Sequence, residues 1–140
     1  MRSLRKDEIK KKLKDIDESI SLVKANLPKR FGFFLELGLL KDGIYKKIEF
    51  AIESVIDICN IINTDLSFGV PSNDEDIIRN LEFNKILSKG LISKIKEMKG
   101  FRNALVHKYG KIDDRLAFLA LQKNLDDFDF FKKEILAFVG

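Results

Sequence analysis

Apolar residues recur at helical intervals over the first part of the chain, between Ile9 and Leu27. Their spacings are 4, 3, 4, 3 and 4 residues, so they form one stripe along an amphipathic helix, which Pro28 ends. Such a stripe faces a core made by other elements. Its members are Ile9, Leu13, Ile16, Ile20, Val23 and Leu27.

The rest of the chain continues this helical pattern, and no alternating β-type pattern competes with it. Apolar residues make up 45% and charged residues 34%, with 8 Gly and 2 Pro, which is typical of a helical protein. We therefore expect an all-α fold, an antiparallel bundle of roughly four to six helices in a single domain over residues 1–140.

Turn and capping residues indicate where these helices begin and end. After the first helix we expect a short irregular stretch over 31–40 and then a long central helix, capped by Asp42 and ending near Asn63. The capping-box spacing over 72–75 opens a third helix that is interrupted at Gly90, and a fourth runs from about Leu91 to Gly110, with Gly100 marking a close approach of another backbone. A last segment is capped by Asp113 or Asp114 and runs to Phe138.

Composition limits the class of protein but not its function. The single cysteine, Cys59, lies in an apolar run and is expected in the core rather than as a nucleophile. Charges interrupt any apolar core of a signal peptide, and no stretch is long enough to span a membrane, so we expect a cytoplasmic protein. The net charge of +4 gives only weak support for a nucleic-acid partner.

Three polar residues gather near the end of the fourth expected helix: Arg102, Asn103 and His107. Arg102 and His107 are five positions apart and point roughly 140° away from each other on an ideal helix. Asn103 and His107, however, are spaced i and i+4, and the long side chain of Arg102 can swing toward them. A polar triangle at one end of the helix is therefore feasible.

These residue types suit phosphate chemistry, because an imidazole near a helix C-terminus can transfer protons and a guanidinium can bind phosphate through its fork of donors. A purely structural explanation competes on the residues alone. In that case Arg102 pairs with an acidic neighbour, His107 caps helix carbonyls and Tyr109 covers the edge of the core.

The string Arg-Asn-x-x-x-His-x-Tyr over 102–109, with its flanks 98–101 and 110–113, resembles the motif of HEPN domains. It is most similar to the HepT toxin branch, whose motif is Arg-x4-His-x-Tyr. The resemblance takes in most of residues 43–138, including the helix over 48–62 and the segment over 116–138, while the first 42 residues match less distinctly. The motif shows no departure at its named positions.

This resemblance implies a metal-independent endoribonuclease without cofactors, in which Arg102 and His107 are the catalytic pair and Asn103 helps to order the site. It also implies a two-fold homodimer whose interface forms the cleft, so that two such pairs surround one RNA phosphate. The composition agrees with a metal-free site, because one histidine and one cysteine cannot form an imidazole- or thiolate-rich metal site within the chain.

The resemblance further implies a toxin-antitoxin system. Tyr109 corresponds to the tyrosine that antitoxins of the minimal nucleotidyltransferase type, MntA, modify by AMPylation. A bulky anionic adduct two residues from His107 would obstruct the cleft and repel RNA, so inhibition is expected.

Two other functions remain open at this point. The first is a non-catalytic helical module that docks a nucleotidyltransferase and presents nucleotide or substrate, which needs Arg102 but no proton transfer by His107. The second is a helical scaffold that only dimerises, with the motif as polar packing.

Overall fold

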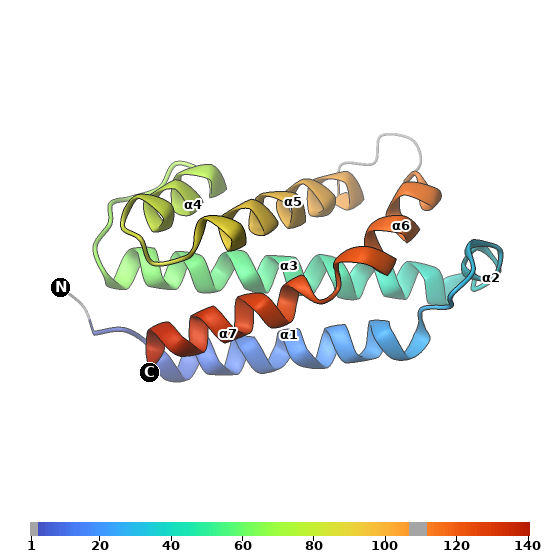
Figure 1. Cartoon of the computed structure of the whole chain (residues 1–140), viewed down its shortest axis with the longest axis horizontal. Coiled ribbons are helices and arrows are strands. Elements are labelled where there is room, and N and C mark those ends of the chain that lie inside the picture. The colour runs from blue at the N-terminus through green and yellow to red at the C-terminus, as the bar shows by residue number, and fades with distance from the viewer. Residues whose placement is uncertain (1–2, 107–111) are drawn as a thin grey trace.

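The computed structural model describes residues 3–106 and 112–140, and every regular element in these ranges is a helix (Figure 1). The predicted all-α fold is thus confirmed. No helix within the two described ranges has both the length and the apolar content needed to cross a bilayer. The helices are α1 (Lys6–Asn26), α2 (Phe31–Leu35), α3 (Leu39–Asp65), α4 (Asp74–Phe83), α5 (Lys89–Val106), α6 (Asp114–Asn124) and α7 (Asp127–Val139).

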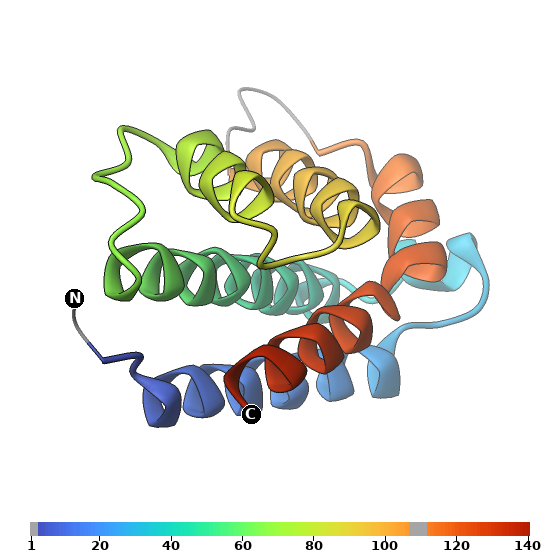
Figure 2. The same cartoon turned by 60° about the vertical axis from the view of Figure 1, so that its left-hand side comes forward.

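The long helix α3 lies in the middle of the bundle, with α1 and α7 on one side and α4 and α5 on the other (Figure 1, Figure 2). It is apolar on more than one face, as expected for the central helix, and its fully buried residues include Ile48, Ile52, Ile58 and Ile62. Cys59 is fully buried among them, and this burial raises the pKa of its thiol to about 12. The cysteine is therefore a core residue, as predicted.

Helix α1 runs antiparallel to α3 and packs along it with the stripe found in the sequence (Figure 1). Five members of the stripe, from Ile9 to Val23, are buried, and the sixth, Leu27, is partly buried against the core. The helix ends where expected, at Asn26, before Pro28. The intervals of three and four residues therefore predicted both the helix and the face that it buries.

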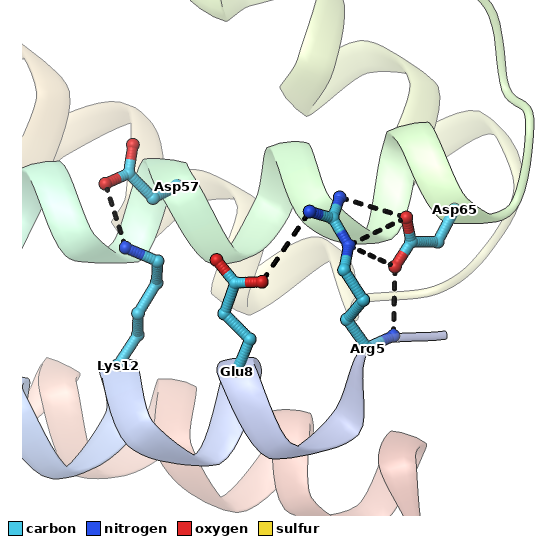
Figure 3. A network of polar contacts seen from close by, with 5 residues as sticks. All are labelled: Arg5, Glu8, Lys12, Asp57 and Asp65. Atoms are coloured by element: carbon cyan, nitrogen blue, oxygen red, sulfur yellow. Dashed lines mark hydrogen bonds and ion pairs between the residues drawn. The ribbon is translucent and has the colours of Figure 1, made fainter. Parts of the chain in front are cut away.

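The segment before α1 is tied to the far end of α3 by a charged pair (Figure 3). The carboxylate of Asp65 is 0% exposed and accepts from the backbone N of Arg5 at 2.9 Å and from its Nε at 3.0 and 3.1 Å. Lys12 and Asp57 form a second, more exposed pair between the same helices at 3.6 Å. A charge buried at the end of α3 is thus compensated by the chain that leads into α1.

Several helix boundaries differ from the sequence prediction for local reasons. Asp42 does not cap α3, because Gly38 takes a backbone conformation with φ of 61° and the helix starts at Leu39. The break after α4 comes at Lys85, which has φ of 56°, and Gly90 lies inside α5. The close approach expected at Gly100 is wrong, since a Cβ at this position would have no neighbour within 4 Å among the described residues.

The expected last segment is two helices, which brings the number in the described ranges to seven. The chain turns at Leu125 and Asp126, between α6 and α7 (Figure 1). The two helices pack on different partners, α6 on α2 and α7 on α1 and α5. The turn allows one apolar segment to cover two separate parts of the bundle.

Candidate functional site

The upstream half of the predicted motif lies in the last two turns of α5. Both Arg102 and Asn103 are helical, and the structure describes this helix as far as Val106. His107 and Tyr109 lie outside the described residues. The structure therefore places Arg102 and Asn103 and leaves the other two predicted site residues as sequence-based predictions.

The guanidinium of Arg102 is held through one of its nitrogens. Nη2 donates to Oδ2 of Asp74 and to Oδ1 of Asn103, at 3.1 Å in each case. The side chain of Arg102 is 20% exposed, so it is sheltered but still reaches the surface. Arg102 and Asn103, which the sequence predicted to act together, are thus in direct contact.

Asp74, which is not among the residues predicted for the site, comes from the first turn of α4. Helices α4 and α5 are antiparallel neighbours, so the start of α4 lies beside the end of α5 (Figure 2). The N-cap of α4 is Asn73, whose Oδ1 accepts from the backbone N of Asp76, one residue later than the cap expected at Ser72. The capping-box pattern and the short connection to the next helix were the signals that could have found Asp74.

Further polar contacts fix α4 against its two neighbours. Glu75 forms an ion pair with Lys99 of α5, and Nδ2 of Asn80 donates to Oδ1 of Asn63 in α3 at 2.9 Å. Asn63 is fully buried and also donates to the carbonyl of Gly69, in the loop before α4, at 2.8 Å. These contacts hold both ends of α4, and so the carboxylate of Asp74 sits on a well-fixed element.

A charged groove of about 380 Å³ runs between α4 and α5 and has Asn103 in its wall. Cationic and anionic side chains face each other across it and form ion pairs, Lys99 with Glu75 and Lys96 with Glu82. The residues lining it are Glu75, Ile78, Arg79, Glu82, Lys96, Lys99, Gly100 and Asn103.

A second cavity, of about 240 Å³, is lined mainly by apolar side chains of α3, α5, α6 and α7 and contains neither Arg102 nor Asn103. Within the described part of the chain, no three or more His, Cys, Asp or Glu side chains gather as metal ligands would.

The chain downstream of the motif is anchored at the start of α6. Oδ1 of Asp113 accepts from the backbone N of Leu116 and caps the helix, as predicted for one of the two aspartates. Asp114 accepts from the Tyr45 hydroxyl at 2.5 Å and from Nζ of Lys41 at 2.8 Å, both in α3. Asp74 therefore fixes the chain to the bundle at Arg102, and Asp114 fixes it again at the start of α6.

The Asp114 carboxyl is shifted toward its charged form. Its burial opposes ionisation, but the hydrogen bonds from Lys41 and Tyr45 and the charge of Lys41 outweigh this, and the pKa of Asp114 lies below its usual range. Burial, together with the hydrogen bond to Asp114, raises the pKa of Tyr45 far above its usual value. The pair is therefore a neutral phenol donating to a carboxylate.

Comparisons with known proteins agree on one family. The family model described as "Ribonuclease HepT-like" matches residues 16–135. The chain is 30% identical, over 92 residues, to the mRNA nuclease HepT of Shewanella oneidensis, an alignment that covers 66% of this chain and 69% of that protein.

Solved structures show the same arrangement of helices. A tri-AMPylated HEPN toxin of Shewanella oneidensis, solved in complex with an MNT antitoxin, superposes with a TM-score of 0.83 at 27% identity and covers 92% of this chain and 96% of that one. The cytosolic protein YutE of Bacillus subtilis superposes with a TM-score of 0.80 over 99% of this chain and 93% of its own. At 16% identity, the second likeness shows the fold alone.

The lowered pKa of Asp114 predicts an acid-dependent loss of stability. A carboxyl with a lowered pKa in the folded state stabilises the fold above the unfolded-state pKa, and this contribution disappears as the pH falls through the folded-state pKa. We expect Asp114→Asn to cost about 1 kcal/mol near pH 7 and progressively less below about pH 4, measured by urea unfolding across this range. Asp126→Asn, which changes an exposed carboxylate paired with Lys24, is the control and should cost little at any pH. If the loss of unfolding free energy in Asp114→Asn does not change with pH, the pKa of Asp114 is not lowered in the folded protein.

Proposed function

The chain belongs to the HepT-like ribonuclease family, and we propose that it is the endoribonuclease toxin of a toxin-antitoxin pair, with Arg102 and His107 as its catalytic residues and no metal ion. The observation that carries the proposal is the guanidinium of Arg102, fixed by Asp74 and Asn103 at the end of α5 and still partly exposed. It lies five residues before the single histidine of the chain.

The proposed reaction is an internal transesterification of RNA. The ribose 2′-oxygen forms a bond to the adjacent phosphorus, the bond from phosphorus to the 5′-oxygen of the next nucleotide breaks, and a 2′,3′-cyclic phosphate and a 5′-hydroxyl result. His107 moves the protons, and Arg102 stabilises the charge that develops on the phosphoryl oxygens. DNA is not a substrate because it lacks the attacking hydroxyl.

A two-fold dimer completes this site in the proposal. One chain holds a single histidine, whereas the reaction removes a proton from the 2′-hydroxyl and delivers one to the leaving oxygen. Two His107 side chains lining one cleft would divide these roles. Exposed apolar side chains in the helix that follows the motif in the sequence support such an interface, since Leu116 and Leu119 of α6 are 65% and 54% exposed.

The proposed partner is a nucleotidyltransferase antitoxin of the MntA type, which inactivates the toxin by AMPylation of Tyr109. The Shewanella oneidensis toxin with this fold is AMPylated and was solved in complex with an MNT antitoxin. An AMP group on Tyr109 would add negative charge and bulk two residues from His107, where RNA phosphate has to bind.

Ribonuclease activity is the first test. Purified unmodified protein is expected to cleave RNA in the presence of EDTA and to leave 2′,3′-cyclic phosphate ends, as identified by mass spectrometry. Arg102→Ala and His107→Ala should each lower the rate by about 100-fold or more. Lys24→Ala, which removes a positive charge from the exposed pair with Asp126, is the control and should keep full activity. Equal cleavage by wild type and His107→Ala would reject the catalytic proposal and favour a module that only binds its partner.

The dimer is tested by the mass of the protein in solution. Sedimentation of the wild type should give the mass of two chains. The double variant Leu116→Glu with Leu119→Glu should give the mass of one chain, because negative charges would face each other across the interface, and it should no longer cleave RNA. Leu22→Glu, on the exposed face of α1, should leave the dimer intact. A monomeric wild type that cleaves RNA would contradict the two-chain cleft.

Modification of Tyr109 is tested by coexpression with an MntA-type nucleotidyltransferase. Mass spectrometry of tryptic peptides should find AMP on the peptide that contains Tyr109, and the modified protein should no longer cleave RNA. In Tyr109→Phe the adduct should be absent, because the acceptor hydroxyl is missing. An adduct that persists in Tyr109→Phe would place the modification elsewhere.

A further inference from the structure

The hydrogen bonds of Arg102 to other described residues all come from one nitrogen of its guanidinium. Nη2 has one N–H for each of its two acceptors, Asp74 and Asn103. Among the described residues, none accepts from Nη1 or Nε. The donors that remain, on Nη1 and Nε, lie in the plane of the guanidinium but point in different directions, so a single phosphate group accepts from one of these nitrogens at a time.

Asp74 supplies the contact that comes from outside α5. Asn103 is the next residue on the same helix, so its bond to Arg102 does not fix the guanidinium relative to the rest of the bundle. The carboxylate of Asp74, in contrast, belongs to a helix that is tied to α5 through Glu75 and Lys99 and to α3 through Asn80 and Asn63. A long arginine side chain, which otherwise samples many rotamers, is thereby fixed at its tip.

The charge of Asp74 is compensated on two sides, which makes a carboxylate tolerable close to an RNA phosphate. Asp74 lies in the first turn of α4, where the free N–H groups at the start of the helix favour a negative charge. Its Oδ2 also faces the cation of Arg102 at 3.1 Å. Its field at the phosphate site is therefore partly cancelled.

We propose that Asp74 is a positioning residue, which holds Arg102 through Nη2 so that its cation, with an N–H of Nη1 or Nε, faces the scissile phosphate. This inference rests on the proposed ribonuclease function and adds a residue to it. Asp74 touches neither RNA nor the reacting atoms. Its effect appears in the transition state, where charge on the phosphoryl oxygens grows and a fixed cation stabilises them more than a mobile one does.

The test compares neighbouring carboxylates of the same helical turn. In the full-length protein, Asp74→Ala is expected to lower kcat roughly 10- to 100-fold, while KM for a short RNA changes less than about threefold. The control Asp76→Ala removes another carboxylate of this helical turn, which pairs with Arg79 of the same helix, and should keep kcat within about twofold of wild type. Affinity for a fully 2′-O-methylated RNA of the same sequence, which cannot react, should be similar in all three proteins.

Two more variants separate positioning from simple loss of structure. Asp74→Asn keeps the volume and one acceptor oxygen but loses the charge, so we expect an intermediate kcat. Asp74→Glu keeps the carboxylate and should recover part of the activity lost in Asp74→Ala. Circular dichroism and thermal unfolding show whether each variant is folded, and Asp74→Asn decides the question if Asp74→Ala does not fold.

Three results would overturn the inference in distinguishable ways. If Asp74→Ala and Asp76→Ala have the same kcat, Asp74 does not position Arg102, and the proposed function is unaffected. If Asp74→Ala binds the methylated RNA more tightly and cleaves faster, Asp74 competes with phosphate for the guanidinium and inhibits the enzyme. If the unmodified wild type does not cleave RNA, the proposed function is wrong and this inference falls with it.

Discussion

Helix α3 is buried along most of its length, and the long helices around it each pack on a different part of its surface. Its last turn also buries two polar residues, Asn63 and Asp65, which need partners because unpaired polar groups in a core are costly. Asn63 finds a partner in α4, and Asp65 in the segment before α1 (Figure 3). The position of α4 determines where Asp74 lies, and Asp74 binds the guanidinium of Arg102. The packing of α4 on α3 therefore fixes this guanidinium indirectly.

The sequence predicted the elements with strong periodicity and missed details that depend on single backbone conformations. The stripe of α1 and the central role of α3 follow directly from apolar spacing, because each interval of three or four residues returns to the same face of a helix. The helix boundaries at Gly38 and Lys85 depend on left-handed backbone conformations. Lys85 has a Cβ and rarely adopts such a conformation, so nothing in the local sequence marks it as the end of a helix.

In the candidate site, residues adjacent in the sequence could be predicted together, whereas a residue from another helix could not. Arg102 and Asn103 are adjacent in the chain and were found together from their residue types. Asp74 is 28 positions away from Arg102 and meets it only because α4 and α5 pack antiparallel in one register. A shift of that register by one turn would separate the two side chains without changing either helix. Contacts of this kind depend on packing, which one sequence does not specify.

The two terminal helices of the described chain, α1 and α7, lie side by side (Figure 2). Lys132 of α7 donates to Asp17 of α1 at 2.6 Å, across 115 positions of sequence, and Phe131 and Ile135 of α7 are fully buried. During synthesis on the ribosome, α1 emerges early and keeps this side of its apolar face uncovered until α7 follows. The bundle therefore closes only when translation of these last helical turns is finished, and a nascent chain has to remain soluble with part of its core exposed until then.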